Sequence, residues 1–143
     1  MAKFLEKAAD GTYVVSAPSY RVAVHGHTFD VYVAENCFCT LDVRTAVPQT
    51  SDALEEVAEH ESVYPTLVDI AEKPGEVTFT WSGKSDLWEK KTYVLRCDFL
   101  RFTYTVTVAG QGSVDAVRYF AGAGNGSAYE FSEGFTPCVS WYN

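Results

Sequence analysis

The stretch from Trp88 to Gly122 decides the fold class, and it reads WEKKTYVLRCDFLRFTYTVTVAGQGSVDAVRYFAG. Residues 92–97, 99–108 and 113–120 are rich in β-branched and aromatic side chains, which favour strands. A one-residue break at Asp98 separates the first two runs, and the turn sequence Gly110-Gln111-Gly112 separates the last two. The stretch therefore predicts an antiparallel meander.

The rest of the chain continues the same pattern. Further alternating or apolar runs predict strands over 13–17, 20–25, 28–34, 37–46, 66–71, 77–81, 128–131 and 138–142. Gly26 can take the positive φ of a tight hairpin between His25 and His27. Asp52 and Glu55 have the spacing of a capping box, which predicts a short helix over 52–61. We expect one domain over residues 1–143, an all-β antiparallel β-sandwich or supersandwich with at most one short helix.

Composition excludes several classes of function. A net charge of −8 and a pI near 4.7 argue against a partner that is nucleic acid or an anionic membrane, because both need a basic surface. No apolar run approaches the length of a membrane span. Glu6 and Lys7 interrupt the N-terminal stretch, so a signal peptide is not indicated, and we expect a cytoplasmic location.

Four cysteines are present, at positions 37, 39, 97 and 138. Cys37 and Cys39 lie two residues apart in a predicted strand, so their Cα atoms are about 7 Å apart and cannot readily be bridged. We expect all four to be reduced thiols that pack as small apolar groups. A zinc site from Cys37, Cys39 and His25 or His27 is the alternative, but no second close pair completes four ligands. The sequence therefore indicates neither a metal nor another cofactor.

No stretch carries a recognisable catalytic motif. Residues 122–127 read GAGNGS, but neither a following helix nor a lysine completes a phosphate-binding loop. The acidic residues between 52 and 61 place Glu56 and His60 on one face of the predicted helix, where a solvated face is the simpler interpretation. We therefore assign no catalytic residue, although a pair of carboxylates would need no motif.

Aromatic residues give the candidate binding site. Trp81 and Trp88 flank a polar turn, and indole faces can stack on the apolar faces of sugar rings. The candidate sugar-binding residues are Trp81, Trp88, Lys84, Asp86, Arg96 and Tyr119. The alternative is that both tryptophans fill the core of the sandwich, as large aromatic side chains usually do.

Three segments resemble a known family. Residues 81–95 (WSGKSDLWEKKTYVL), 119–122 (YFAG) and 131–137 (FSEGFTP) are similar to the N-terminal β-sandwich of glycosidases related to α-glucosidases and α-galactosidases. Those domains have the galactose-mutarotase-like supersandwich architecture and precede a catalytic barrel. The resemblance spans residues 66–141. A barrel alone needs about 200 residues or more, so the resemblance carries over no catalytic residue.

The resemblance implies a non-catalytic, carbohydrate-related module, with a carbohydrate ligand and either a catalytic partner domain or a second copy as partners. Two alternatives stay open. One is a small sugar-active lyase or epimerase that uses paired carboxylates, and the other is a protein–protein assembly module with an exposed sheet edge. Turnover, sugar binding without turnover, or a defined oligomer would separate the three.

Overall fold

The fold is all-β. The computed structural model describes residues 3–114, 117 and 129–131, and among these there are thirteen strands and no helix. The strands are β1 (Leu5–Lys7), β2 (Tyr13–Ser16), β3 (Arg21–His25), β4 (Thr28–Val33), β5 (Asn36–Asp42), β6 (Gln49–Thr50), β7 (Glu56–Val57), β8 (Thr66–Lys73), β9 (Glu76–Gly83), β10 (Lys90–Asp98), β11 (Phe102–Ala109), β12 (Ser113–Val114) and β13 (Tyr129–Phe131). The predicted fold class is confirmed, and each run predicted before residue 98 contains a strand.

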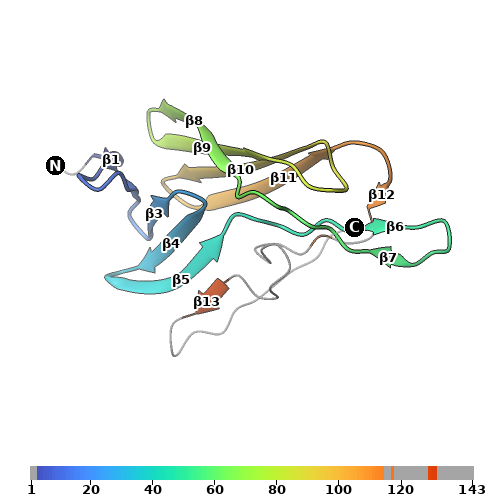
Figure 1. Cartoon of the computed structure of the whole chain (residues 1–143). Coiled ribbons are helices and arrows are strands. Elements are labelled where there is room, and N and C mark those ends of the chain that lie inside the picture. Colours follow the sequence, from blue (N-terminus) through green and yellow to red (C-terminus); the bar gives the residue numbers. More distant parts are fainter. Residues whose placement is uncertain (1–2, 115–116, 118–128, 132–143) are drawn as a thin grey trace.

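The strands form three antiparallel sheets. The N-terminal sheet has the order β1-β2-β3-β4-β5-β13, and the second sheet has the order β11-β10-β9-β8. These two sheets lie as separate layers, and a small sheet, β12-β6-β7, lies at the end away from the N-terminus (Figure 1). The arrangement is sandwich-like, with the core between the two larger sheets.

The core forms because apolar residues alternate along both sheets. In the second sheet the inward rows of β9 and β10 are fully buried, and they comprise Val77, Phe79, Trp81, Lys91, Tyr93, Leu95 and Cys97. From the N-terminal sheet, Val15, Val22, Val24, Phe29 and Val31 pack against them. A period of two puts every second side chain on the inner face, so one lysine follows the apolar residues into the core.

The predicted meander is confirmed for its first two strands and differs in its turn. β11 begins at Phe102 and not at Phe99, because the Asp98 carboxylate accepts hydrogen bonds from the N–H groups of Leu100 (2.8 Å) and Arg101 (3.0 Å). A short aspartate side chain that binds the backbone two and three residues later closes a tight turn. Of the third run, Ser113–Val114 pairs with β6 and not with β11. The predicted strand over 138–142 and the 122–127 loop lie outside the described residues.

The predicted helix over 52–61 is wrong. Leu54 has a φ of 62°, which no right-handed helix contains, and β7 pairs with β6 to make a hairpin here. The N–H of Glu55 donates to the hydroxyl of Ser51 (3.2 Å), so Ser51 and not Asp52 organises the turn. Leu54 is 85% exposed, and the segment therefore has no apolar face for a helix to bury.

Candidate functional site

The two tryptophans of the candidate site belong to the core. Trp81 and Trp88 are 0% and 3% exposed. The indole N–H of Trp81 donates to the carbonyl of Gly26 (2.7 Å), and that of Trp88 donates to the carbonyl of Val47 (2.7 Å). Each indole is therefore packed on its faces and satisfied at its nitrogen, and neither offers a free face on which a sugar could stack.

The other candidate residues lie apart from each other. Lys84 is exposed in the loop between β9 and β10, and the Asp86 carboxylate accepts a hydrogen bond from the N–H of His60 (2.8 Å). Arg96 lies on the outer face of β10, where its guanidinium pairs with Asp98 (3.0 Å) and with Glu76. Tyr119 lies outside the described residues. Among the described residues, the candidate sugar-binding side chains therefore do not form a common site around the turn.

The cysteines and histidines do not assemble either. Cys37, Cys39 and Cys97 are free thiols, and Cys138 lies outside the described residues. Within the described ranges no group of three or more histidine, cysteine or acidic side chains is placed to hold a metal ion. Burial raises the pKa of the Cys39 thiol to about 11 and that of Cys97 to about 12, so both are protonated at neutral pH.

A buried ionic cluster lies under the segment between β7 and β8. The Lys91 ammonium, which is fully buried, donates to Glu61 Oε1 (2.5 Å), to the carbonyl of Thr45 (2.6 Å) and to Glu59 Oε1 (2.8 Å). The side chains of Glu59 and Glu61 are 2% and 4% exposed. We call Glu59, Glu61, Lys91 and Tyr93 the lysine cluster.

The lysine cluster is a buried ionic network that joins separate segments of the chain. All three protons of the ammonium are used, so Lys91 has no free amine to act as a nucleophile. The Tyr93 hydroxyl donates to Glu61 Oε1 (2.5 Å), and burial together with the Glu61 carboxylate raises the pKa of Tyr93 far above its ordinary value. The second oxygens of Glu59 and Glu61 are buried without a partner among the described residues. Two carboxylates are thus paired, as the enzyme alternative needs, but they are closed to a substrate.

The lysine cluster is not among the predictions from sequence. The acidic stretch around Glu59 predicts the solvated face of a helix, and no prediction includes Lys91. One signal was available, because Lys91 occupies the inward position in the alternation with Tyr93, Leu95 and Cys97. A charged residue at a core position of a strand needs a partner of opposite charge. Glu59 and Glu61, in the acidic stretch between residues 52 and 61, supply it.

The outer face of the second sheet is covered with hydroxyl groups. Residues that are paired across neighbouring strands have their side chains on the same side of the sheet, so the registers show which residues lie on this face. The hydroxyl-bearing members are Thr66, Thr78, Thr80, Ser82, Thr92, Thr103, Thr105 and Thr107. They are half-buried or exposed, and none has a side-chain hydrogen bond within the described residues. We call this surface, with Val94 and Arg96 at its centre, the hydroxyl face; the N-terminal sheet lies on the opposite side (Figure 1).

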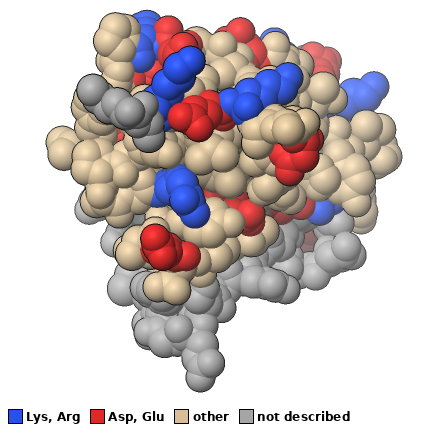
Figure 2. All heavy atoms as spheres, turned by 90° about the vertical axis from the view of Figure 1, so that its left-hand side faces the viewer, with Lys and Arg blue, Asp and Glu red and all other residues tan. Residues whose placement is uncertain are grey.

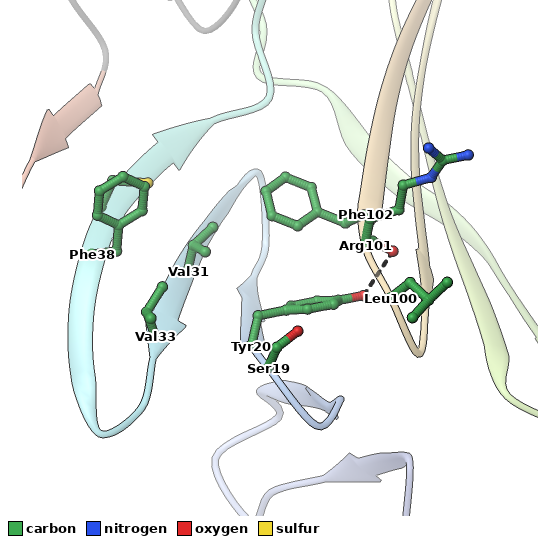
Figure 3. A pocket seen from close by; sticks show the side chains of 9 residues that line it. Ser19, Tyr20, Val31, Val33, Phe38, Leu100, Arg101 and Phe102 are labelled. Atoms are coloured by element: carbon green, nitrogen blue, oxygen red, sulfur yellow. Dashed lines mark hydrogen bonds between the residues drawn. The ribbon is translucent and has the colours of Figure 1, made fainter. Parts of the chain in front are cut away.

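An apolar cavity opens between the sheets beside β11. Its volume is about 320 Å³, and it lies between Val31, Val33 and Phe38 on one side and Tyr20, Leu100 and Phe102 on the other (Figure 3). The Tyr20 hydroxyl, turned from the cavity, binds the carbonyls of Asp98 (2.7 Å) and Arg101 (3.0 Å). The Arg101 side chain points away from the cavity (Figure 3). The cavity therefore has apolar walls and no charged group directed into it.

Charge is mixed on the side of the molecule that Figure 2 shows. On the side that carries the N-terminus, acidic and basic side chains are interspersed, and no broad basic area is visible there (Figure 2). That side offers no continuous surface for a phosphate backbone. The described part of the chain also contains no long apolar helix of the kind that crosses a bilayer.

Comparison of the chain with protein-family models, with curated proteins and with solved structures finds no match. The resemblance to glycosidase sandwich domains therefore stays a prediction. The function is therefore inferred from the geometry of the lysine cluster and of the hydroxyl face.

Proposed function

We propose that this domain is a non-catalytic, carbohydrate-related β-sandwich module that binds a neutral saccharide on the hydroxyl face. The observation that carries the proposal is the set of eight hydroxyl side chains that share one face and have no side-chain hydrogen bond within the described residues. Each hydroxyl can donate one hydrogen bond and accept two, which is also the capacity of a sugar hydroxyl.

The spacing of the side chains on the hydroxyl face suits an extended ligand. Neighbouring strands are about 4.8 Å apart, and alternate residues of one strand are about 6.7 Å apart. Within the described residues the face is the surface of a sheet, so a single sugar ring would be held by only a few hydrogen bonds. A polysaccharide chain that lies across several strands makes many such contacts at once, and we therefore assign the ligand to that class.

The charges on the face favour a neutral ligand. Arg96 is the basic group at its centre, and it already pairs with Glu76 and Asp98. By the same registers Asp69, Lys73 and Lys90 also lie on this face, so acidic and basic groups are mixed on it. Among the described residues, no unpaired basic group lies at its centre to select a uronate or a sulfated sugar. The resemblance to glycosidase sandwich domains points to the same ligand class. The lysine cluster gives no support to the enzyme alternative, because its carboxylates are closed to solvent.

The test is retention on insoluble and soluble neutral polysaccharides, such as cellulose, chitin, starch and galactan. A triple Thr80→Val, Thr92→Val and Thr105→Val variant removes three hydroxyls from the centre of the face and keeps the β-branched shape. We expect it to lose binding by at least about tenfold, because each lost hydrogen bond contributes about 0.5–1.5 kcal/mol. Circular dichroism checks that the fold is unchanged.

Lys84→Ala is the matched control, because Lys84 belongs to the turn between the two tryptophans and is exposed. We expect this variant to bind as the wild type does. Loss of binding in Lys84→Ala with full binding in the triple variant would move the site back to the turn. No retention of the wild type on any neutral polysaccharide would contradict the proposal itself.

A further inference from the structure

One line of side chains across the hydroxyl face consists of hydroxyl groups alone. Three lines of outward side chains cross all four strands of the second sheet. Asp69 and Val94 interrupt the hydroxyls of one line. Ala71 and Arg96 interrupt those of another. The line nearest the loop between β9 and β10 is complete; we call it the hydroxyl row, and it comprises Thr66, Ser82, Thr92 and Thr107.

Each of the four strands contributes one hydroxyl to the hydroxyl row. Thr66 and Thr107, at its two ends, are exposed, and the two central members are half-buried. None of the four has a side-chain hydrogen bond within the described residues, so each can donate one hydrogen bond to a ligand and accept two. Because neighbouring strands are about 4.8 Å apart, the row extends over about 14 Å.

We infer that the saccharide is an extended chain of diequatorially linked sugars, of which β-1,4-glucan is the simplest, and that it lies along the hydroxyl row with one ring over each strand. This inference rests on the proposed function. One ring of such a chain advances by roughly one strand spacing, so successive rings meet successive hydroxyls. An α-1,4-linked glucan coils, and its rings leave a straight row after one or two contacts.

The other direction on the face, along a strand, fits such a chain less well. β9 and β11 each present three outward hydroxyls, but alternate residues of a strand are about 6.7 Å apart. That distance exceeds the advance of one ring, so a chain laid along a strand meets a hydroxyl at one ring and falls between hydroxyls at the next. The direction across the strands is therefore the one that the spacing favours.

The twist of the sheet adds that the ligand is a single chain. Neighbouring strands are rotated by about 20–25°, so the side chains of the row fan out by about 60–75° between β8 and β11. A dissolved chain can rotate about its glycosidic bonds to follow this change, whereas the flat face of a polysaccharide crystal cannot. We therefore assign soluble, single chains as the ligand.

The first arm of the test varies the ligand, and calorimetric titration measures the affinity. Cello-oligosaccharides of two to six rings are the probes. We expect the affinity to rise by about two- to tenfold per ring up to four rings and then to change little, since each ring adds one hydrogen-bonded contact. Maltotetraose contains the same four glucose units with α-1,4 linkages, and it should bind at least about fivefold more weakly than cellotetraose.

The second arm compares two double variants that are matched in exposure. One carries Thr92→Val and Thr107→Val, which remove two hydroxyls from the row. The other carries Thr78→Val and Thr103→Val, which remove two hydroxyls from the line farthest from it. Each pair has one half-buried and one exposed threonine, and valine keeps the β-branched shape. The first variant should bind cellotetraose at least about fivefold more weakly, and the second should stay within about twofold of the wild type.

The single variant Thr107→Val tests the register of one ring per strand. Its affinity for cellotetraose should fall by about two- to tenfold, to that of cellotriose, because one ring loses its hydroxyl. Its affinity for cellotriose should stay within about twofold, since three rings still meet Thr66, Ser82 and Thr92. A disturbed fold would lower both affinities, so the two measurements separate a lost contact from a structural effect.

Two kinds of result would overturn the inference and leave the proposed function standing. One is equal affinity for cellotetraose and maltotetraose, or equal losses in the two double variants. The other is retention on a neutral polysaccharide by a protein that binds no cello-oligosaccharide. If no saccharide binds at all, the proposed function and the inference fail together.

Discussion

At the scale of single residues, the burial of the Lys91 charge constrains how the chain can fold. Its ammonium lies at an inward position of β10 and is fully buried. Removing such a charge from water costs several kcal/mol, so the residue is tolerated only because three acceptors surround it. Two of the acceptors come from the segment between β7 and β8. The lysine cluster thereby fixes an otherwise exposed segment to the core.

The first prediction concerns this ion cluster. Lys91→Met keeps most of the side-chain volume but leaves two carboxylates buried without a counter-charge. We expect the free energy of unfolding to fall by about 3–5 kcal/mol, as is usual when one partner of a buried ion pair is removed. Urea denaturation followed by tryptophan fluorescence measures this change.

The control for Lys91→Met is a triple variant that also carries Glu59→Gln and Glu61→Gln. Both glutamines keep an acceptor for Val47 N–H and for the Tyr93 hydroxyl, which the carboxylates bind in the wild type. The triple variant should recover much of the lost stability, because neutral groups of similar shape can replace a buried ion pair. Equal losses in the single and triple variants would show that packing, and not charge, holds the cluster.

At the scale of elements, glycines close two of the hairpins. Gly26 joins β3 to β4 with a φ of 60°, and Gly75 joins β8 to β9 with a φ of 73°. Both lie in the left-handed region, where a Cβ atom is unfavourable. They differ in their surroundings: a Cβ on Gly26 would meet nothing within 4 Å, whereas one on Gly75 would lie 2.7 Å from the Phe99 ring.

The second prediction compares these two turns. Gly26→Ala should cost about 1–2 kcal/mol, from backbone strain alone. Gly75→Ala should cost more, because the Phe99 ring must move and lose its edge-on contact with Phe4, whose centroid is 5.1 Å away. Thermal melting of the two variants gives the difference. In a Phe99→Ala background the two alanine variants should have similar costs, and a difference that persists there would contradict the argument.

Turn residues and hydrophobic alternation predicted a strand or a hairpin correctly where a single local signal was sufficient. Gly26 between two strands predicted a hairpin, and alternation predicted β9 and β10. The helix over 52–61 failed because a capping-box spacing is a local signal, and the carboxylates of Glu59 and Glu61 are used by a lysine 32 and 30 residues away. Periodicity also could not decide whether Trp81 and Trp88 were stacking faces or core. That depends on which strands pack on them, which is a tertiary property.

At the scale of the whole molecule, several buried acids release no proton at neutral pH. Burial raises the pKa of Cys39 to about 11 and of Cys97 to about 12, and it raises the pKa of Tyr20 and Tyr93 well above the ordinary value of 10.0. The unfolded chain releases these protons at lower pH than the folded domain does. Above about pH 9 the folded state therefore holds more protons, and the free energy of unfolding falls as pH rises.

The third prediction follows from this linkage. The melting temperature should fall steadily from about pH 9 to about pH 11, where the unfolded thiols and phenols ionise. Scanning calorimetry in matched ionic strength measures the fall. A Cys97→Ala variant should melt lower at neutral pH but lose less over the alkaline range, since one of the shifted groups is gone. An identical alkaline loss in wild type and variant would argue against the assigned role of that thiol.

The contact between Tyr20 and the turn after β10 also has a consequence for synthesis. Its hydroxyl binds carbonyls 78 and 81 residues further along the chain, whereas β2 to β5 pair with consecutive neighbours. The first hairpins can therefore form while the ribosome is still translating, but their apolar faces stay uncovered until the second sheet, up to the turn that Tyr20 binds, has been made and released. At about 5–20 residues per second this interval lasts for seconds, long enough for a chaperone to bind the half-made sandwich.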